Sequence, residues 1–459
     1  MCLLAIFKKI RELPMRPLTF CFTLLICCTP FFGDAQSYQL EKGIKSQKIK
    51  FQLINNLIII PIEVNGTELS FILDSGVSKP ILFNLTDHGA IKINNVSEIT
   101  IRGLGEGEPI KALSSKGNSF HLKNIKNDDQ QLYVVLDRGL NFSPALGTTI
   151  HGIIGYDLFK DLVVDVNYAS KTIKFYDPER FNYKADKKTE VLPISIRNKK
   201  AYVDGNLFLD EETEMPVKLL VDTGSSDAIW LFEDESLGIP EKNYDDFLGE
   251  GLNGSIFGKR TKVTSINLGS FVLKDAKAAF PDMRYFGSVK NLGNRNGSLG
   301  GEILKRFNII FDYPNNKMAF KKNGNYSKPF HYNLSGITLQ HNGLRYLSES
   351  IADGRGVVKS EDRNFGDVQI LLEMRTKLSL VPEIIVSGIR AGSPAHEAGL
   401  REGDVVLAVN GKKVHRYKLQ EIMHMLDERE GKKVRVMIER ANDDLQFSFT
   451  LKKLFRPIP

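Results

Sequence analysis

The chain has 459 residues, of which 42% are hydrophobic and 25% charged, and its formal net charge is +7. At roughly 100–200 residues per domain, this length accommodates several domains that can each bury a core. The composition excludes a disordered, a collagen-like and a multi-span membrane protein. The charges are spread along the chain rather than clustered, so no nucleic-acid partner is expected.

The first 35 residues have the pattern of a secretory signal. Basic residues precede the apolar run 18–32, and the small residues Gly33 and Ala35 follow it, which predicts cleavage after Ala35. The alternative is an uncleaved membrane anchor, the only membrane attachment expected, since no later segment approaches the ~18 apolar residues of a spanning helix. We therefore expect secretion across the inner membrane, to the periplasm or to the cell exterior.

All cysteines lie in this first segment, at Cys2, Cys21, Cys27 and Cys28. A mature chain without thiols excludes a cysteine nucleophile, a thiolate zinc site and a disulfide framework, and it suits a bacterial envelope protein. The histidines show no paired ligand spacing, so we expect neither a metal nor another cofactor.

The middle of the chain contains an internal duplication. The segment LSFILDSGVSKPILF aligns with VKLLVDTGSSDAIWL, which places Asp74 on Asp222 at an offset of 222 − 74 = 148. Further on, residues 152–175 align without a gap with residues 297–320, at an offset of 297 − 152 = 145. Matched landmarks in the same order indicate two copies of one domain.

Both copies are expected to be rich in β-strands. Apolar runs such as 51–66 end in Asn-Gly or Asp-Ser-Gly, which are residues of tight turns between strands. Helical stretches are short, so each copy should form a small barrel or sandwich. The predicted copies extend over 37–180 and 190–325.

Each copy carries an apolar strand that runs into Asp-Ser/Thr-Gly. The glycine allows a neighbouring backbone to approach closely, and the hydroxyl can form a hydrogen bond to the equivalent loop. One such triplet is more often an ordinary turn, but two at matched repeat positions indicate a functional pair.

These turns, together with Ile153-Ile154-Gly155 and Ser298-Leu299-Gly300, resemble the retropepsin-like aspartic peptidases, and the resemblance covers about residues 40–325. It implies a mainly β fold in which two duplicated acid-protease barrel lobes form a bilobal unit, with an apolar element beneath each turn. It also implies that Asp74 and Asp222 are the catalytic pair that activates a water for peptide-bond hydrolysis. The supporting turn residues are Ser75, Gly76, Thr223, Gly224 and Ser225.

Two carboxyl groups about 3 Å apart share one proton, because both cannot ionise at that separation. The ionised member takes a proton from water and the protonated member polarises the carbonyl, so an acid-shifted pH optimum is expected. The hydroxyl of Ser225 can reach Asp222, whereas Val77 occupies the equivalent position beside Asp74. We therefore expect Asp74 to bind the proton more tightly, unless Val77 crowds the site.

A glycine-rich LGEG sequence follows each aspartate, after 104 − 74 = 30 and 248 − 222 = 26 residues. The resemblance implies that both are flaps that fold over the substrate, and an ordinary glycine hairpin is the alternative. Trp230 is expected in the core of lobe two rather than at the substrate. The flap candidates are Leu104, Gly105, Gly107, Leu248, Gly249 and Gly251.

The C-terminal part, 384–411 followed by YKLQEIMHMLDER, resembles a PDZ domain. The resemblance implies a β-barrel with two helices over 329–456, interrupted by a charged insertion at about 343–382. It also implies a groove that accepts C-terminal peptides as an added strand. The groove candidates are Leu334, Ser335, Gly336, Ile337, Leu419 and Met423.

The sequence thus predicts a secreted or periplasmic aspartic endopeptidase that binds a peptide or protein substrate, with a PDZ module for peptide or protein C-termini. The alternative is a catalytically inactive binding or scaffold protein that uses the protease fold as a peptide-binding platform.

Overall fold

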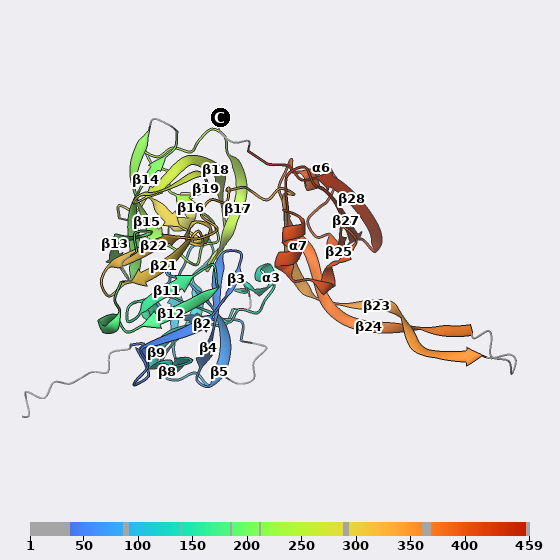
Figure 1. The fold of residues 1–459 in the computed structure, drawn as a ribbon, viewed down its shortest axis with the longest axis horizontal. Helices are drawn as coiled ribbons and strands as arrows, with labels where there is room; N and C mark the ends of the chain where they lie inside the picture. The colour runs from blue at the N-terminus through green and yellow to red at the C-terminus, as the bar shows by residue number, and fades with distance from the viewer. Residues whose placement is uncertain are drawn as a thin grey trace, which may run out of the picture. The chain divides into compact units, whose positions relative to one another are not determined.

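The computed structural model describes residues 37–85, 91–137, 139–183, 186–210, 213–287, 293–359 and 369–455. The predicted signal lies outside these residues. The described chain is mainly β (Figure 1). None of its helices within these ranges combines the length and the apolar character needed to cross a membrane.

The first lobe is built on a nine-stranded sheet in the order β1-β9-β6-β10-β5-β4-β8-β7, with β3 paired to β4. Strand β5 ends at the first Asp-Ser-Gly turn and lies between β4, to which it is antiparallel, and β10, to which it is parallel. Its elements are β1 (Gln39–Leu40), β3 (Gln52–Ile54), β4 (Leu57–Val64), β5 (Thr67–Leu73), β6 (Ile81–Leu82), β7 (Ser97–Ile101), β8 (Ile110–Leu122), β9 (Ile125–Val135), α3 (Ser143–Leu146), β10 (Gly152–Ile154) and α4 (Tyr156–Phe159).

The second lobe repeats this arrangement. Strand β15 ends at the Asp-Thr-Gly turn and lies between antiparallel β14 and parallel β20, as β5 lies between β4 and β10. The duplication expected from the sequence is therefore present in the pairing of the strands. The elements are β13 (Thr189–Arg197), β14 (Lys200–Phe208), β15 (Glu214–Val221), β16 (Ile229–Leu231), β17 (Tyr244–Gly251), β18 (Gly254–Leu268), β19 (Phe271–Pro281), the 3₁₀ turn η3 (Met283–Phe286), β20 (Gly297–Leu299) and α5 (Gly301–Leu304).

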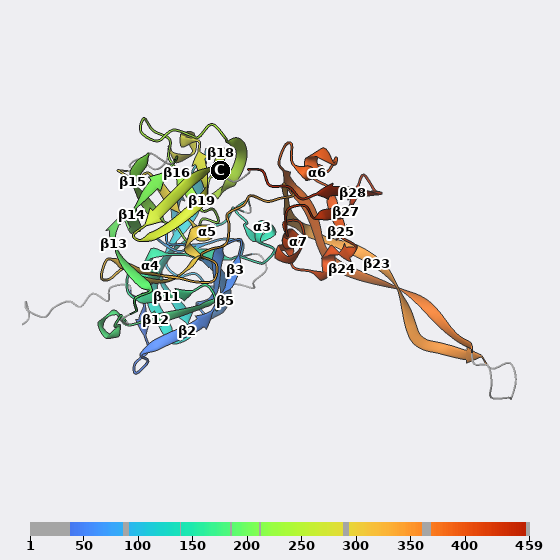
Figure 2. The same cartoon turned by 45° about the horizontal axis from the view of Figure 1, so that its top comes forward.

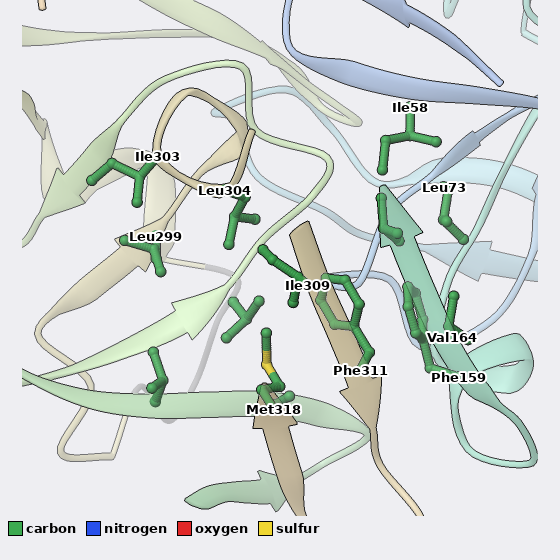
Figure 3. Packing of buried hydrophobic residues seen from close by; sticks show 14 of the residues in the cluster. Ile58, Leu73, Phe159, Val164, Leu299, Ile303, Leu304, Ile309, Phe311 and Met318 are labelled. Atoms are coloured by element: carbon green, nitrogen blue, oxygen red, sulfur yellow. The ribbon is translucent and has the colours of Figure 1, made fainter. Parts of the chain in front are cut away.

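A shared sheet joins the two lobes. Its order is β13-β22-β21-β11-β12-β2, and β11 of the first lobe pairs with β21 of the second, with Val164 opposite Phe311. One apolar core continues through both lobes, and the rings of Phe159 and Phe311 lie 5.1 Å apart within it (Figure 3). This continuity fixes the two Asp-containing turns relative to each other. The elements not yet named are β2 (Ser46–Lys50), β11 (Val163–Asn167), β12 (Thr172–Tyr176), η2 (Pro178–Arg180), β21 (Phe307–Asp312) and β22 (Lys317–Lys322).

The C-terminal module has its own sheet, β23-β24-β25-β27-β28, and its own apolar core. Helix α6 begins after Ser393, whose hydroxyl accepts a hydrogen bond from the N–H of His396, and Pro394 occupies the first turn. The described residues of the insertion at about 343–382 form a two-stranded ribbon made by the long strands β23 and β24 (Figure 2). The elements are β23 (Ile337–Lys359), β24 (Gln369–Ile389), α6 (Pro394–Glu397), β25 (Val405–Val409), β26 (Lys412–Lys413), η4 (Val414–Arg416), α7 (Leu419–Met425), β27 (Lys433–Arg440) and β28 (Asp443–Thr450).

Candidate active site

The two Asp-Ser/Thr-Gly turns hold each other through their hydroxyl residues. The N–H of Ser75 donates to Oγ1 of Thr223 at 2.9 Å, and the N–H of Thr223 donates to Oγ of Ser75 at 3.0 Å. Each hydroxyl also donates across the lobe boundary, from Ser75 to the carbonyl of Val221 and from Thr223 to that of Leu73, both at 2.7 Å. Ser75 and Thr223 are 0% and 1% exposed. The hydrogen bonding between loops that the sequence predicts is confirmed.

This network brings the carboxyl groups of Asp74 and Asp222 together, and the two are hydrogen-bonded to each other. The N–H of Gly76 donates to Oδ1 of Asp74 at 2.7 Å, and the N–H of Gly224 donates to Oδ1 of Asp222 at 3.1 Å. A Cβ atom at Gly76 would lie 3.1 Å from Oδ1 of Asp74 and 3.2 Å from Oδ1 of Asp222. A Cβ atom at Gly224 would lie 2.2 Å from Cγ of Asp74, so glycine is required on that side of the pair.

The pKa of Asp74 is raised from 3.8 to about 8, first by burial and then by the negative charge of Asp222. Burial also raises the pKa of Asp222, but the positive charges of Arg295 and Lys200 oppose this rise. The pair therefore retains a proton that isolated carboxyl groups would lose in the acid range. The higher proton affinity expected for Asp74 agrees with the direction of its shift.

A short element that ends in glycine lies beneath each turn, as the sequence predicts: Ile153-Ile154-Gly155 in lobe one and Ser298-Leu299-Gly300, with a polar first residue, in lobe two. The N–H of Asp74 donates to the carbonyl of Ile154 at 2.7 Å, and the N–H of Asp222 donates to that of Leu299 at 3.0 Å. A Cβ atom at Gly155 would lie 2.0 Å from the carbonyl oxygen of Asp74. The close approach of two backbones explains the glycine at this position.

In lobe two, the residue that follows the glycine of the Asp-Thr-Gly turn does not make the contact expected from the sequence. Within the described part of the chain, the Ser225 hydroxyl forms no hydrogen bond with Asp222, so that predicted contact is wrong. Its Oγ instead lies 3.0 Å from the place a Cβ at Gly300 would occupy, on the side of the turn that faces the supporting element. The side chain of Val77 packs into an apolar cluster of lobe one together with Ile153.

The flap candidates of the two lobes meet at Asn253, which the sequence analysis missed. Asn253 is 5% exposed and forms four hydrogen bonds to the loop between β7 and β8. Leu252, at the tip of the β17–β18 hairpin, packs against the same apolar cluster of lobe one as Val77. The four bonds run from the N–H of Asn253 to the carbonyl of Leu104 (2.9 Å), from the N–H of Gly107 to the carbonyl of Asn253 (2.8 Å), from the N–H of Gly103 to Oδ1 (2.5 Å) and from Nδ2 to the carbonyl of Glu108 (2.6 Å).

The two LGEG sequences occupy different places in their hairpins. Leu104, Gly105 and Gly107 lie in the loop itself, whereas Leu248, Gly249 and Gly251 belong to strand β17 and precede the tip. A Cβ at Gly251 would lie 2.3 Å from the carbonyl oxygen of Leu104, so glycine permits the contact between the hairpins. The tip of the second hairpin is Leu252-Asn253, because the turn closes at Gly254, which has a positive φ of 109°.

A buried ion-pair network supports the second turn. Arg260 donates to Asp227 at 2.7 Å and to Asp246 of strand β17 at 2.6 Å. The indole N–H of Trp230 donates to the same Asp227 at 2.7 Å, and its ring packs in a lobe-two cluster with Phe286. The network connects the turn to the second hairpin and places Trp230 within lobe two.

The loop of the PDZ module that is expected to bind a carboxylate, residues 334–337, already donates its backbone N–H groups to side chains of this protein. A C-terminal carboxylate would have to displace these acceptors. The donor and acceptor pairs are Leu334 N–H to Asp427 Oδ1 (2.7 Å), Ser335 N–H and Gly336 N–H to Asn333 Oδ1 (3.0 and 3.1 Å) and Ile337 N–H to Ser335 Oγ (3.2 Å).

The helix candidates of the groove lie on α7. Leu419 is 2% exposed and belongs to the module's core, and Met423 packs against that core. Between them, the side chain of Gln420 donates to the carbonyl of Leu146 in α3 at 2.7 Å. The helix therefore contacts the first lobe as well as its own sheet.

Comparison with models of protein families agrees with this architecture. A family model described as aspartyl protease matches residues 60–158 and 202–303, and one described as PDZ domain matches residues 385–440. Among solved structures, the chain is similar to the crystal structure of aspartic proteinase from Irpex lacteus, with 12% sequence identity, coverage of 62% of this chain and 99% of that chain, and a TM-score of 0.39. The chain therefore carries aspartyl protease sequence in both lobes and ends in a PDZ domain.

Proposed function

We propose that the protein is an aspartic endopeptidase and that Asp74 and Asp222 are its catalytic residues. One observation carries this proposal: two buried hydroxyl residues, each bonded to the opposite turn, hold the carboxyl groups in hydrogen-bonding contact. The aspartyl protease sequence matches cover both aspartates.

In the proposed reaction, the carboxylate takes a proton from a water molecule held between the two side chains. The water oxygen attacks the carbonyl carbon of the peptide bond, and the carbonyl oxygen receives the proton of the neutral carboxyl group. The tetrahedral intermediate then collapses as the nitrogen receives a proton and the C–N bond breaks.

The pH range of the reaction follows from the shared proton. Because the pKa of Asp74 is raised to about 8, the singly protonated pair persists into the neutral range. Activity should decline only as the pH approaches 8. The active range should therefore extend to a higher pH than the acid-shifted optimum expected from the sequence would suggest.

The PDZ module is proposed to bind a peptide or protein, and C-terminal peptides are the ligands that its fold favours. Such a ligand has to replace Asn333 and Asp427 as acceptors for the loop N–H groups. Export directed by residues 1–35 is part of the same proposal and rests on the sequence pattern alone.

The proposal is tested by incubating the purified chain with the oxidised B chain of insulin between pH 3 and pH 8 and identifying the products by mass spectrometry. The wild type should cleave internal peptide bonds, and Asp74→Asn and Asp222→Asn should each abolish cleavage while circular dichroism shows an unchanged fold. Asp204→Asn is the matched control, because Asp204 is an exposed aspartate of the same lobe that pairs with Lys218. Equal cleavage by the wild type and both Asn variants, or a folded wild type that cleaves nothing, would contradict the proposal and favour a binding protein.

A further inference from the structure

The two lobes differ in the residue opposite each aspartate. Ile59 pairs with Ile72, so two steps along the register Leu57 lies opposite Asp74. Tyr202 pairs with Leu220, so in the same way Lys200 lies opposite Asp222. A lysine therefore replaces a leucine beside the second aspartate.

Leu57 and Lys200 are equivalent residues of the duplicated hairpin. Each is the first residue of its strand, β4 or β14, and each follows a two-residue turn whose residues both have positive φ. The turns are Asn55-Asn56, with φ of 47° and 67°, and Asn198-Lys199, with φ of 50° and 62°.

A second position shows the same exchange of an aliphatic residue for a cation. His151 in lobe one donates its N–H to the carbonyl of Ser70, and Asn296 in lobe two donates its N–H to the carbonyl of Lys218, both at 2.9 Å. The N–H groups of Ser70 and Lys218 in turn donate to the side chains of His151 and Asn296. The residues just before this equivalent pair are Ile150 in lobe one and Arg295 in lobe two.

The aliphatic pair belongs to the apolar cluster of lobe one, where Leu57 and Ile150 are 8% and 0% exposed. The same cluster includes Val77, three residues after Asp74. An apolar surrounding disfavours a charged carboxylate, so this side of the pair favours a neutral Asp74.

The two cations of lobe two lie near Asp222 without a dedicated partner. Nε of Arg295 donates to the carbonyl of Gly297 at 2.8 Å, and its guanidinium lies 5.0 Å from the ring centre of Phe232. In the part of the chain that the structure describes, neither Arg295 nor Lys200 forms an ion pair. Their positive charges act on Asp222 and lower its pKa against the effect of burial.

Building on the proposed function, we propose that Lys200 and Arg295 fix the roles within the pair. Asp222 is the carboxylate that takes the proton from water, and Asp74 is the acid that donates its proton to the carbonyl oxygen. Lys200 and Arg295 are positioning residues, because they act through the charge of Asp222 rather than on the substrate. When the C–N bond breaks, the leaving nitrogen takes the proton that Asp222 received, and Asp74 recovers a proton from the hydroxyl of the intermediate.

The pH dependence follows from the groups that surround each aspartate. Asp222 faces Arg295, Lys200, Asp74 and the N–H of Gly224, whereas Asp74 faces Asp222, Lys200 and the N–H of Gly76. The buried Tyr313 lies near both aspartates, and its pKa is raised, so it stays neutral over the range of the assay. Loss of the Arg295 charge should raise the pKa of Asp222 and so move the acid limb of the pH–rate profile to higher pH. Loss of the Lys200 charge should move both the acid and the basic limb to higher pH, because this charge lowers the pKa of Asp74 as well as that of Asp222.

The test replaces each cation by its lobe-one equivalent, in Lys200→Leu and Arg295→Ile. The rate kcat/KM is measured from pH 3 to pH 9 on a peptide spanning a bond that the wild type cleaves in insulin B chain. A nearby charge shifts a carboxyl pKa by about one unit or more, so each variant should lose about tenfold of its rate on the acid limb, with a smaller loss toward pH 7. Lys218→Leu is the control, because Lys218 lies on β15 and pairs with Asp204; it should keep the wild-type profile.

The possible results separate a failure of this inference from a failure of the proposed function. An acid limb that stays at the wild-type pH in both variants, or a rate loss that is equal at every pH, overturns the inference and leaves the proposed function intact. A folded wild type without activity overturns the proposed function, and the inference with it. If Arg295→Ile does not fold, the test rests on Lys200→Leu and on Arg295→Lys. Arg295→Lys retains the positive charge, so the inference predicts that it keeps the wild-type pH–rate profile.

Discussion

Replacing Thr223 by valine tests whether the hydroxyl network holds the two turns together. Valine has nearly the shape of threonine, so the substitution removes the hydroxyl without opening a cavity. It leaves the N–H of Ser75 and the carbonyl of Leu73 without their partner at a site that is 1% exposed. An unpaired buried polar group costs about 1–3 kcal/mol, so two should lower the free energy of unfolding by about 2–6 kcal/mol.

Urea unfolding measures this change, and Trp230 is a convenient reporter because it is the only tryptophan and lies just after the second turn. Thr223→Ser keeps the hydroxyl and is the matched control, with an expected loss of about 1 kcal/mol for the methyl group. Ser75→Ala removes the reciprocal hydroxyl, and the double variant should lose less than the sum of the single losses, because both hydroxyl groups belong to one network. A Thr223→Val protein within 1 kcal/mol of the wild type would refute the reasoning.

Three further perturbations test the surroundings of the pair. Asn253→Ala removes the side-chain bonds to Gly103 and Glu108, so amide hydrogen exchange at Gly103 should accelerate; unchanged exchange would contradict a joining role. Gly155→Ala places a Cβ 2.0 Å from the carbonyl oxygen of Asp74 and should lower the midpoint of thermal unfolding by many degrees. Gly324→Ala is the control, because the added atom meets nothing within 4 Å, and it should leave the midpoint unchanged. Similar midpoints for the two variants would count against the close packing at Gly155. Asp74→Asn should gain stability over the wild type as the pH rises from about 4 to about 8, because over this range the Asp74 carboxyl loses its proton in the unfolded state but keeps it in the folded state, which favours unfolding of the wild type. Calorimetric melting curves that shift in parallel would exclude this.

The features that the sequence predicts best depend on short segments that repeat. The aspartate, the hydroxyl residue and the glycine of each turn are adjacent in the chain, and Gly155 and Gly300 end the matched segments GIIG and GSLG. A close backbone contact leaves such a local signature, because it restricts the residue types at a few neighbouring positions.

The features that the sequence does not predict depend on contacts between distant segments. Asn253 joins the two hairpins, yet an asparagine before a glycine looks like any turn residue until its partner loop, 253 − 103 = 150 residues earlier, is placed against it. Ser225 has the right chemistry to contact Asp222, but the backbone turns its side chain toward Gly300.

Arg295 could have been found by extending the alignment of 152–175 with 297–320 backward, because the same offset of 295 − 150 = 145 places it on Ile150. Lys200 required the strand register, because its offset from Leu57, 200 − 57 = 143, differs from the offset of 148 between the aspartates. Their equivalents, Leu57 and Ile150, differ from them in charge, and a charge that replaces an aliphatic residue at a duplicated position is a visible signal. The structure adds that both positions lie near the aspartates, which depends on strand register.

The central claim is that Asp74 and Asp222 hold one proton in common well above the acid range. Carbon-13 NMR of protein labelled at the aspartate carboxyl groups measures this directly, with Asp74→Asn as the assignment standard. We predict a wild-type carboxyl resonance that titrates near pH 8 and is absent from the Asp74→Asn spectrum. Ordinary titration of both aspartates near pH 4, each independent of the other, would contradict the account.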